Sequence, residues 1–228
     1  MIQILTYMCS IFLFMGHLIP EEEKDPKVIV SIFIKDQQEE NIKLLANPIF
    51  FKAPTESDNQ VEVRSVWDND SLYFFIEVTD TDLKAYQHEK DHPLLYLDDM
   101  IEILIDAENH KNDCWFTDDI VYHINLLGQK KDDRGTDTCL SDSGWDGNAR
   151  YTVTLKGTLN NSTDIDQGYS IEIAFPWEEL GVKPKIKRII GVNFANGDND
   201  GNGRQLFDWS GAWPLRTPSQ FGSLILEE

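Results

Sequence analysis

The stretch that decides the fold is Asp98-Asp99-Met100-Ile101-Glu102-Ile103-Leu104-Ile105-Asp106. Its isoleucines occupy every second position, at 101, 103 and 105, and a methionine, a glutamate and a leucine stand between or beside them. Successive side chains of a β-strand point to opposite faces, so a period of two predicts a strand rather than a helix. We therefore expect one isoleucine face to pack in a core and the face that carries Glu102 to lie on the other side of the sheet.

The same alternation recurs along the chain. It is clear over residues 72–78, 120–126, 151–155 and 171–175, with further strand candidates near 27–34, 47–52, 61–67, 188–195 and 222–227. Turn-rich stretches rich in Asp, Asn and Gly separate these strands at 68–70, 132–148, 160–168 and 197–203. Helix signal is scarce, and the clearest example is one turn that begins at Pro176 and ends at Gly181.

Many short strands with one apolar face each need a second sheet to cover them. The sequence therefore predicts an all-β protein, an antiparallel β-sandwich of jelly-roll type with one or two short helical turns. No linker, repeat or low-complexity tract divides the body of the chain, so we expect a single domain from residue 21 to 228.

The amino-acid composition excludes some classes of binding partner. The 228 residues include 40 Asp and Glu against 20 Lys and Arg, which gives a net charge of −20 at pH 7. Such a chain repels phosphate backbones and anionic lipids, so neither nucleic acid nor a membrane surface is expected as a partner. Hydrophobic residues make up 41% of the chain, which excludes wholesale disorder.

The N-terminus has the pattern of an export signal. Residues 1–20 contain no charged side chain and include an apolar run, and the acidic cluster Glu21, Glu22 and Glu23 follows directly. We expect residues 1–20 to be a signal peptide and the mature chain to be periplasmic, cell-surface or secreted, without membrane insertion. The alternative is a mis-assigned start or a buried strand.

Two cysteines, Cys114 and Cys139, remain once the leader is set aside. An even number of cysteines in an exported chain permits one disulfide. The alternative is two separate small hydrophobic side chains, since sequence spacing does not report the distance between them.

Several segments, in order, resemble the family 9 carbohydrate-binding modules, which are DOMON-like jelly-roll sandwiches. They are Val66-Trp67-Asp68-Asn69-Asp70-Ser71-Leu72-Tyr73, Glu77-Val78-Thr79-Asp80, the stretch 98–106, residues 168–177, 190–193 and 198–204, and Pro218-Ser219-Gln220-Phe221-Gly222. The resemblance implies non-catalytic binding of the terminal sugar of an oligo- or polysaccharide such as xylan or cellulose, in support of extracellular carbohydrate catabolism. It also implies a glycoside hydrolase as partner, because modules of this kind are often attached to xylanases.

The resemblance also implies a site in which two aromatic rings sandwich a sugar. The rings match Tyr96, where the family more often has Trp, and Trp213, while the slot carboxylate matches Glu102 and its basic partner matches His123. The strand pattern independently places Glu102 and His123 opposite the apolar faces, and Asn125 shares the face of His123. Flat rings suit the C–H faces of a pyranose, and polar groups suit its hydroxyls. The alternative is that all five are ordinary surface residues.

Four other tryptophans are expected to be packing residues: Trp67, Trp115, Trp177 and Trp209.

A candidate metal loop lies near the C-terminus. Asp198, Asp200 and Asn202 place oxygen side chains at alternate positions before Gly203, as at the start of an EF-hand loop. Such a loop can offer several oxygens to Ca²⁺, although the position of the bidentate glutamate is occupied by Trp209. We expect structural calcium at these residues and no organic cofactor. The alternative is a polar hairpin turn.

Two other classes of function stay open from the residues alone. A glycoside hydrolase could use a carboxylate pair drawn from Asp98, Asp99 and Glu102, although 40 acidic residues make chance pairs common. A haem or electron-transfer domain could use Met100 and His123 as axial ligands.

Overall fold

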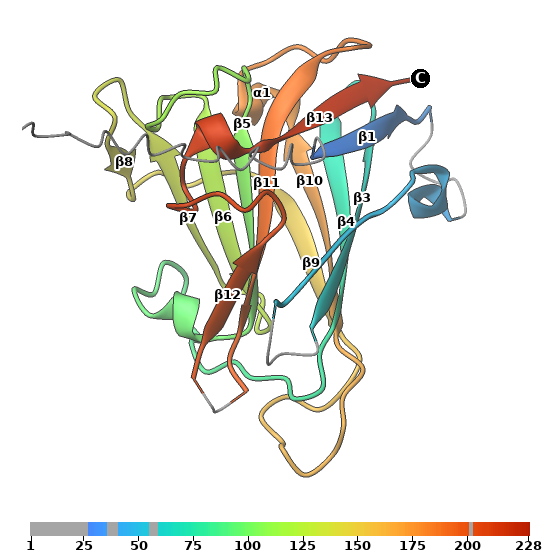
Figure 1. The fold of residues 1–228 in the computed structure, drawn as a ribbon, viewed down its shortest axis with the longest axis vertical. Helices are drawn as coiled ribbons and strands as arrows, with labels where there is room; N and C mark the ends of the chain where they lie inside the picture. Colours follow the sequence, from blue (N-terminus) through green and yellow to red (C-terminus); the bar gives the residue numbers. More distant parts are fainter. Residues whose placement is uncertain (1–26, 36–40, 55–58, 201–202) are drawn as a thin grey trace, which may run out of the picture.

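The computed structural model describes residues 27–35, 41–54, 59–200 and 203–228, and these form an almost all-β fold (Figure 1). The strands are β1 (Val28–Phe33), β2 (Ile49–Lys52), β3 (Gln60–Trp67), β4 (Ser71–Thr79), β5 (Met100–Asp106), β6 (Asp119–Asn125), β7 (Lys130–Gly135), β8 (Ser141–Asp142), β9 (Arg150–Leu155), β10 (Tyr169–Pro176), β11 (Ile189–Asp198), β12 (Gln205–Asp208) and β13 (Gly222–Glu227). The helical elements are α1 (Trp177–Leu180) and three 3₁₀ turns, η1 (Ile42–Leu45), η2 (Leu95–Leu97) and η3 (Pro218–Gln220).

The strands are joined in one hydrogen-bonded path that folds back into two layers. Its order is β8-β7-β6-β5-β11-β13-β1-β3-β4-β10-β9, with β12 added on β11 and β2 added on β3. Figure 1 shows the described N-terminal strand β1, in blue, beside the C-terminal strand β13, in red. The predicted β-sandwich is confirmed, but β1 pairs parallel with both β13 and β3, so the sheet is not wholly antiparallel as expected.

Aromatic side chains join the two layers across the core. Phe74 of β4 packs against Phe194 of β11 with ring centroids 5.1 Å apart, and Tyr122 of β6 packs against Phe175 of β10 at the same distance. The isoleucines at 101, 103 and 105 are fully buried in this core, as the alternation predicts. All four tryptophans expected to be packing residues are buried, with exposed fractions of 4–6%.

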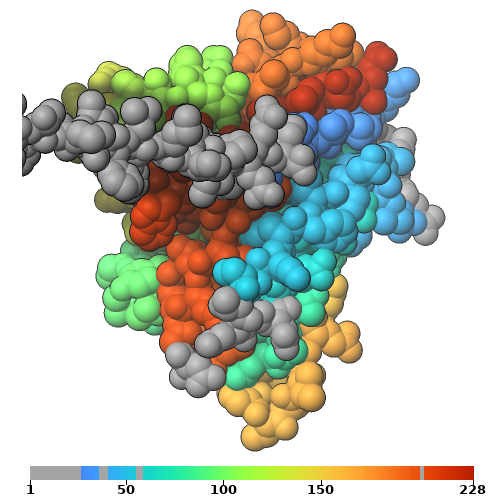
Figure 2. All heavy atoms as spheres, viewed as in Figure 1, coloured from blue at the N-terminus to red at the C-terminus, as the bar shows by residue number. Residues whose placement is uncertain are grey.

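The seam between the layers is closed on one side by the two short added strands. Figure 2 shows β2, in light blue, beside β12, in orange, on the surface of the molecule. Phe51 and Phe207 join these strands, with ring centroids 5.8 Å apart. Because each of these strands pairs with a strand of a different layer, their contact ties the two layers together at this side.

Strand β7 overlaps the stretch 132–148, which the sequence predicts as turn-rich, and that prediction is wrong over residues 132–135. Its sequence is almost entirely charged, so no hydrophobic period marks it. The charges are neutralised inside the fold: Lys130 Nζ lies 3.0 Å from Asp132 Oδ2, and Arg216 Nη2 lies 2.9 Å from Asp133 Oδ2.

Local signals are read correctly at two other points. The single helical turn forms as α1, with Pro176 at its N-cap and Gly181 at its C-cap in the left-handed conformation, at φ 70°. Cys114 and Cys139 form a disulfide that joins the loop before β6 to the loop after β7.

The predicted signal peptide lies outside the described residues. No helix in the described part of the chain has the length and apolar character needed to cross a membrane.

The aromatic contact between the layers gives a stability prediction. Phe74 is fully buried between Phe175 and Phe194. Phe74→Ala leaves a cavity there and lowers the free energy of unfolding by about 3–5 kcal/mol, as measured by urea denaturation. Phe50→Ala on β2, where the ring is 52% exposed, is the matched control and changes stability by about 0.5 kcal/mol or less. Equal losses in the two variants would contradict the core assignment.

Candidate functional site

The site is built on the outer face of β5 and β6. All seven residues of each strand are buried, although only one face of each points into the core between the sheets. On the other face, antiparallel pairing sets Glu102 directly opposite His123, and Leu104 directly opposite Val121. Loops cover this face, so its polar residues are held in a largely dehydrated setting rather than in open solvent.

Glu102 and His123 form the centre of the site. Glu102 Oε1 lies 3.5 Å from His123 Nδ1 and 3.7 Å from Arg204 Nη2. His123 Nε2 lies 2.9 Å from Arg216 Nη2. A guanidinium can only donate, so Nε2 accepts and Nδ1 carries the ring proton, which points toward Glu102. In the described part of the chain, both ion-pair contacts of Glu102 reach Oε1 and neither reaches Oε2.

The charge of Glu102 is maintained despite its burial. The carboxylate is 4% exposed, and burial alone raises its pKa. The neighbouring His123, then Arg216 and Arg204, outweigh burial and hold the pKa of Glu102 below its ordinary value. Glu102 is therefore ionised at neutral pH, with cationic groups on either side of it.

Two exposed rings, Tyr96 and Trp213, belong to segments that contact this charged centre. Tyr96, in η2, is 45% exposed, and the guanidinium of Arg204 lies over its ring at 5.5 Å. Trp213 is 81% exposed, far more than the buried tryptophans. It stands between Ala212, which packs with Leu104 and Val121, and Arg216, which contacts His123. The loop that carries Trp213 therefore lies along the same outer face.

Asn125 is placed differently from the other predicted site residues. It is fully buried, and its Nδ2 donates to Asp98 Oδ2 at 2.8 Å and to the Gln87 carbonyl at 2.9 Å. Its Oδ1 accepts from the N–H groups of Leu127 and Gln129. These contacts fix the loop that leads to Tyr96 and leave the amide no open position. A role for Asn125 in ligand contact stays a prediction.

Arg204 and Arg216 belong to the site, although the sequence did not single them out. Both stand in loops without a period that indicates which way their side chains point. Arg216 also stacks over the Trp115 ring at 5.1 Å and pairs with Asp133. The one available signal was indirect: Arg204 ends a segment that resembles the family, and Arg216 stands three residues after Trp213.

A second cluster is formed by acidic side chains near the start of β5. Asp80, Asp99 and Asp198 are buried and offer carboxylate oxygens within 4.8 Å of one another. They come from three distant segments: the end of β4, the residue before β5, and the end of β11. The predicted loop thus contributes Asp198, with Asp200 adjacent to it, but Asp80 and Asp99 come from other segments, so the cluster is not one local EF-hand-like loop. Asn202 lies outside the described residues.

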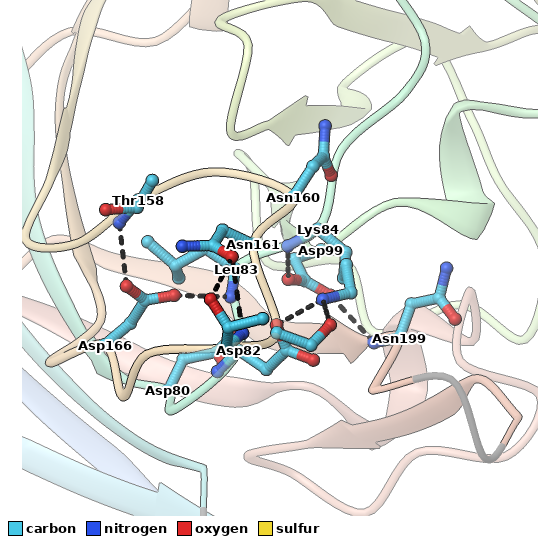
Figure 3. A network of polar contacts seen from close by, with 12 residues as sticks. Asp80, Asp82, Leu83, Lys84, Asp99, Thr158, Asn160, Asn161, Asp166 and Asn199 are labelled. Atoms are coloured by element: carbon cyan, nitrogen blue, oxygen red, sulfur yellow. Dashed lines mark hydrogen bonds and ion pairs between the residues drawn. The ribbon is translucent and has the colours of Figure 1, made fainter.

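Some carboxylate oxygens of this cluster accept hydrogen bonds, but others have no donor. Figure 3 shows Asp99 held by the backbone N–H groups of Lys84, at 2.5 Å, and Asn199, at 2.7 Å. By contrast, both carboxylate oxygens of Asp198 and one of Asp200 are buried without a hydrogen-bond partner. An unpaired buried carboxylate oxygen is costly, so this donor set fits an oxygen-seeking cation such as Ca²⁺.

The raised pKa values of the carboxylates in this cluster also fit a site that holds a cation. Burial raises the pKa of Asp80 to about 6, and burial together with Asp80 raises the pKa of Asp99 to about 8. Burial and the adjacent Asp198 raise the pKa of Asp200 to about 7. Several carboxylates at close range disfavour one another's ionisation, and a bound divalent cation removes that conflict.

The residues that a glycoside hydrolase or a haem domain would use are instead engaged in contacts with other protein groups. Asp98 accepts from the N–H groups of Tyr86 and Gln87, and Asp99 belongs to the acidic cluster. The carboxylates therefore do not form a pair across an open cleft. For the haem alternative, both ring nitrogens of His123 face protein groups, Glu102 and Arg216, so neither is free as an axial ligand.

A β-sandwich with an ionised carboxylate, two arginines and exposed rings on segments of one outer face has the features of a carbohydrate-binding module. A sequence profile of the family described as "Carbohydrate family 9 binding domain-like" matches residues 39–228. The chain belongs to this family, which confirms the resemblance noted in the sequence and the expectation of a non-catalytic binding module.

Relatives of the chain agree with this assignment. Endo-1,4-beta-xylanase A of Thermotoga neapolitana is 28% identical over 177 residues, which cover 75% of this chain and 14% of the xylanase. The chain thus spans about one seventh of that relative. A family 9 module from Caldicellulosiruptor kristjanssonii, solved with cellotriose, matches with a TM-score of 0.66 at 20% identity and covers 88% of this chain and 94% of its own. The same kind of module solved with glucose matches with a TM-score of 0.64.

Proposed function

We propose that the slot between Tyr96 and Trp213 binds the terminal sugar of an oligo- or polysaccharide such as cellulose or xylan. The observation that carries this is the buried, ionised Glu102 beside His123, on the face along which the loops of the exposed rings Tyr96 and Trp213 lie. The rings cover the C–H faces of a pyranose, and Glu102 Oε2 accepts one of its hydroxyl protons. Arg204 and Arg216 supply donors at the slot edges.

The relatives support this choice of ligand. The solved modules hold cellotriose and glucose, and the curated relative is a xylanase. All three concern sugars with equatorial hydroxyls, which a flat slot between two rings accommodates. The protein would be exported and would act beside a glycoside hydrolase, which supplies the catalysis that this chain does not carry out.

Calorimetric titration with cellobiose, xylobiose, glucose and xylose tests this function. We expect a dissociation constant between about 10 μM and 1 mM for at least one of these sugars, because a small sugar buries little surface. Glu102→Gln keeps the shape but removes the charged acceptor and weakens binding by about 10- to 100-fold. Trp213→Ala removes one ring and lowers affinity below detection.

Glu172→Gln is the control, because Glu172 is an exposed residue of β10 on the other sheet. Its affinity for sugar matches that of the wild type. No heat with any of the four sugars, or unchanged binding in Glu102→Gln and Trp213→Ala, would overturn the slot.

The acidic cluster is the structural calcium site of this proposal. Asp80, Asp99, Asp198 and Asp200 would hold the ion, which supplies the positive charge that the buried oxygens of Asp198 lack. The ion would join the ends of β4 and β11 to the residue that precedes β5. That connection fixes the start of the strand on which Glu102 stands.

Thermal unfolding tests the calcium site separately from sugar binding. Ca²⁺ at about 100 times its dissociation constant stabilises the EDTA-treated wild type by about 2.7 kcal/mol, seen as a higher Tm. Asp198→Asn retains the shape of the side chain and abolishes this increase. Asp142→Asn, at an exposed position, keeps it in full. A wild-type Tm that is the same in EDTA and in Ca²⁺ would contradict the assignment.

A further inference from the structure

A separate group of metal-ligating side chains lies at the far end of β5, away from the sugar slot. Asp106 is the last residue of β5 and Asp119 the first of β6, and the two stand directly opposite each other. Asp106 is four positions beyond Glu102 on the same face, about 13 Å along the strand. The acidic cluster around Asp99 lies at the other end of β5.

In the described residues, the paired carboxylates of Asp106 and Asp119 accept backbone N–H groups but have no lysine or arginine partner. Asp106 and Asp119 are 1% and 2% exposed, and like charges directly opposite on a sheet repel each other. In the described part of the chain, no lysine or arginine side chain forms an ion pair with Asp106, Asp118 or Asp119. The ammonium of the adjacent Lys111 instead donates to the carbonyls of Phe221 and Gly222.

A histidine completes the group. Asp106, His110 and Asp118 each offer a ligand atom within 4.8 Å of the other two. His110 Nδ1 lies 3.1 Å from Asp118 Oδ2, and the His110 side chain is 57% exposed. The group therefore has a buried floor of carboxylates and one accessible side through which an ion can enter.

An independent observation points to a ligand. Asp119 accepts from the Phe116 N–H through Oδ2 at 2.7 Å, but its buried Oδ1 has no hydrogen-bond partner. Asp119 is paired directly across the two strands with Asp106, so the two side chains lie next to each other on one face and Asp119 borders the same group. A buried carboxylate oxygen without a donor is costly, and a cation at this position satisfies it.

We propose that Asp106, His110, Asp118 and Asp119 form a second metal site, specific for a divalent transition metal such as Zn²⁺. The imidazole nitrogen distinguishes it from the all-oxygen calcium cluster, since nitrogen ligands favour Zn²⁺ and carboxylates alone favour Ca²⁺. Bound metal joins the end of β5 and the start of β6 to the intervening loop. That loop carries Trp115, whose Nε1 donates to the Arg216 carbonyl at 2.7 Å.

Calorimetric titration of the EDTA-treated chain with ZnCl₂, in saturating CaCl₂ and a non-chelating buffer, tests the site. The wild type binds one Zn²⁺ under these conditions, and His110→Ala weakens binding at least about 10-fold. His88→Ala, which removes another exposed histidine, leaves the zinc affinity unchanged. Asp198→Asn loses calcium binding and keeps zinc, which separates the two sites.

Co²⁺ gives a second readout that does not depend on heat. The wild type develops a visible d–d absorbance with added CoCl₂ that ZnCl₂ displaces, and His110→Ala lacks it. The proposal is overturned if the wild type binds no Zn²⁺ at 100-fold molar excess, if His110→Ala binds it equally, or if saturating Ca²⁺ prevents the binding. Because His110 is largely exposed, its substitution does not endanger folding.

Discussion

The structure depends on one constraint: β5 and β6 are buried on both faces. Their inner faces supply isoleucines and Tyr122 to the core, so these strands cannot shift without emptying it. The same register then fixes which residues stand opposite each other on their outer faces. Along that face the cross-strand pairs are Met100–Asn125, Glu102–His123, Leu104–Val121 and Asp106–Asp119. The core therefore sets the geometry of the binding groups.

The pair of Glu102 and His123 on that face is completed by residues from elsewhere in the chain. Arg204 and Arg216 approach Glu102 and His123 from loops after β11 and β12. The apolar pair of Leu104 and Val121 lies between the pairs Glu102–His123 and Asp106–Asp119. It packs against the loop that carries Trp213. A rigid strand pair thus positions the charged groups, while loops supply the rings and cations, an arrangement suited to recognising one neutral sugar by its hydroxyl pattern.

Much of this could be predicted from the sequence, because alternation reports which residues share a face. The opposition of Glu102 and His123 to the isoleucine faces followed from that period alone. The register between the strands did not, since a shift of one residue flips every side chain and only packing selects the correct one. The contributions of Arg204 and Arg216 could not be predicted, because loop residues carry no period.

The acidic cluster could not be predicted fully from the sequence either, because its residues come from distant segments. Asp80 and Asp99 stand in segments that resemble the family, yet their meeting with Asp198 requires β5 to lie beside β11. A local reading of the sequence could find Asp198 and Asp200 only as neighbours in one loop. Strand β7 was missed for a related reason, since its charges are satisfied by residues such as Arg216 that are distant in sequence.

The central claim is that the outer face of β5 and β6 binds sugar. Amide chemical-shift mapping during a titration with cellobiose or xylobiose tests it most directly. The claim predicts that the largest shifts fall on Tyr96, Glu102, His123 and residues 210–217. It would be contradicted if the largest shifts fell instead on the hollow of about 230 Å³ on the other sheet, lined by Tyr73, Phe75 and Tyr151.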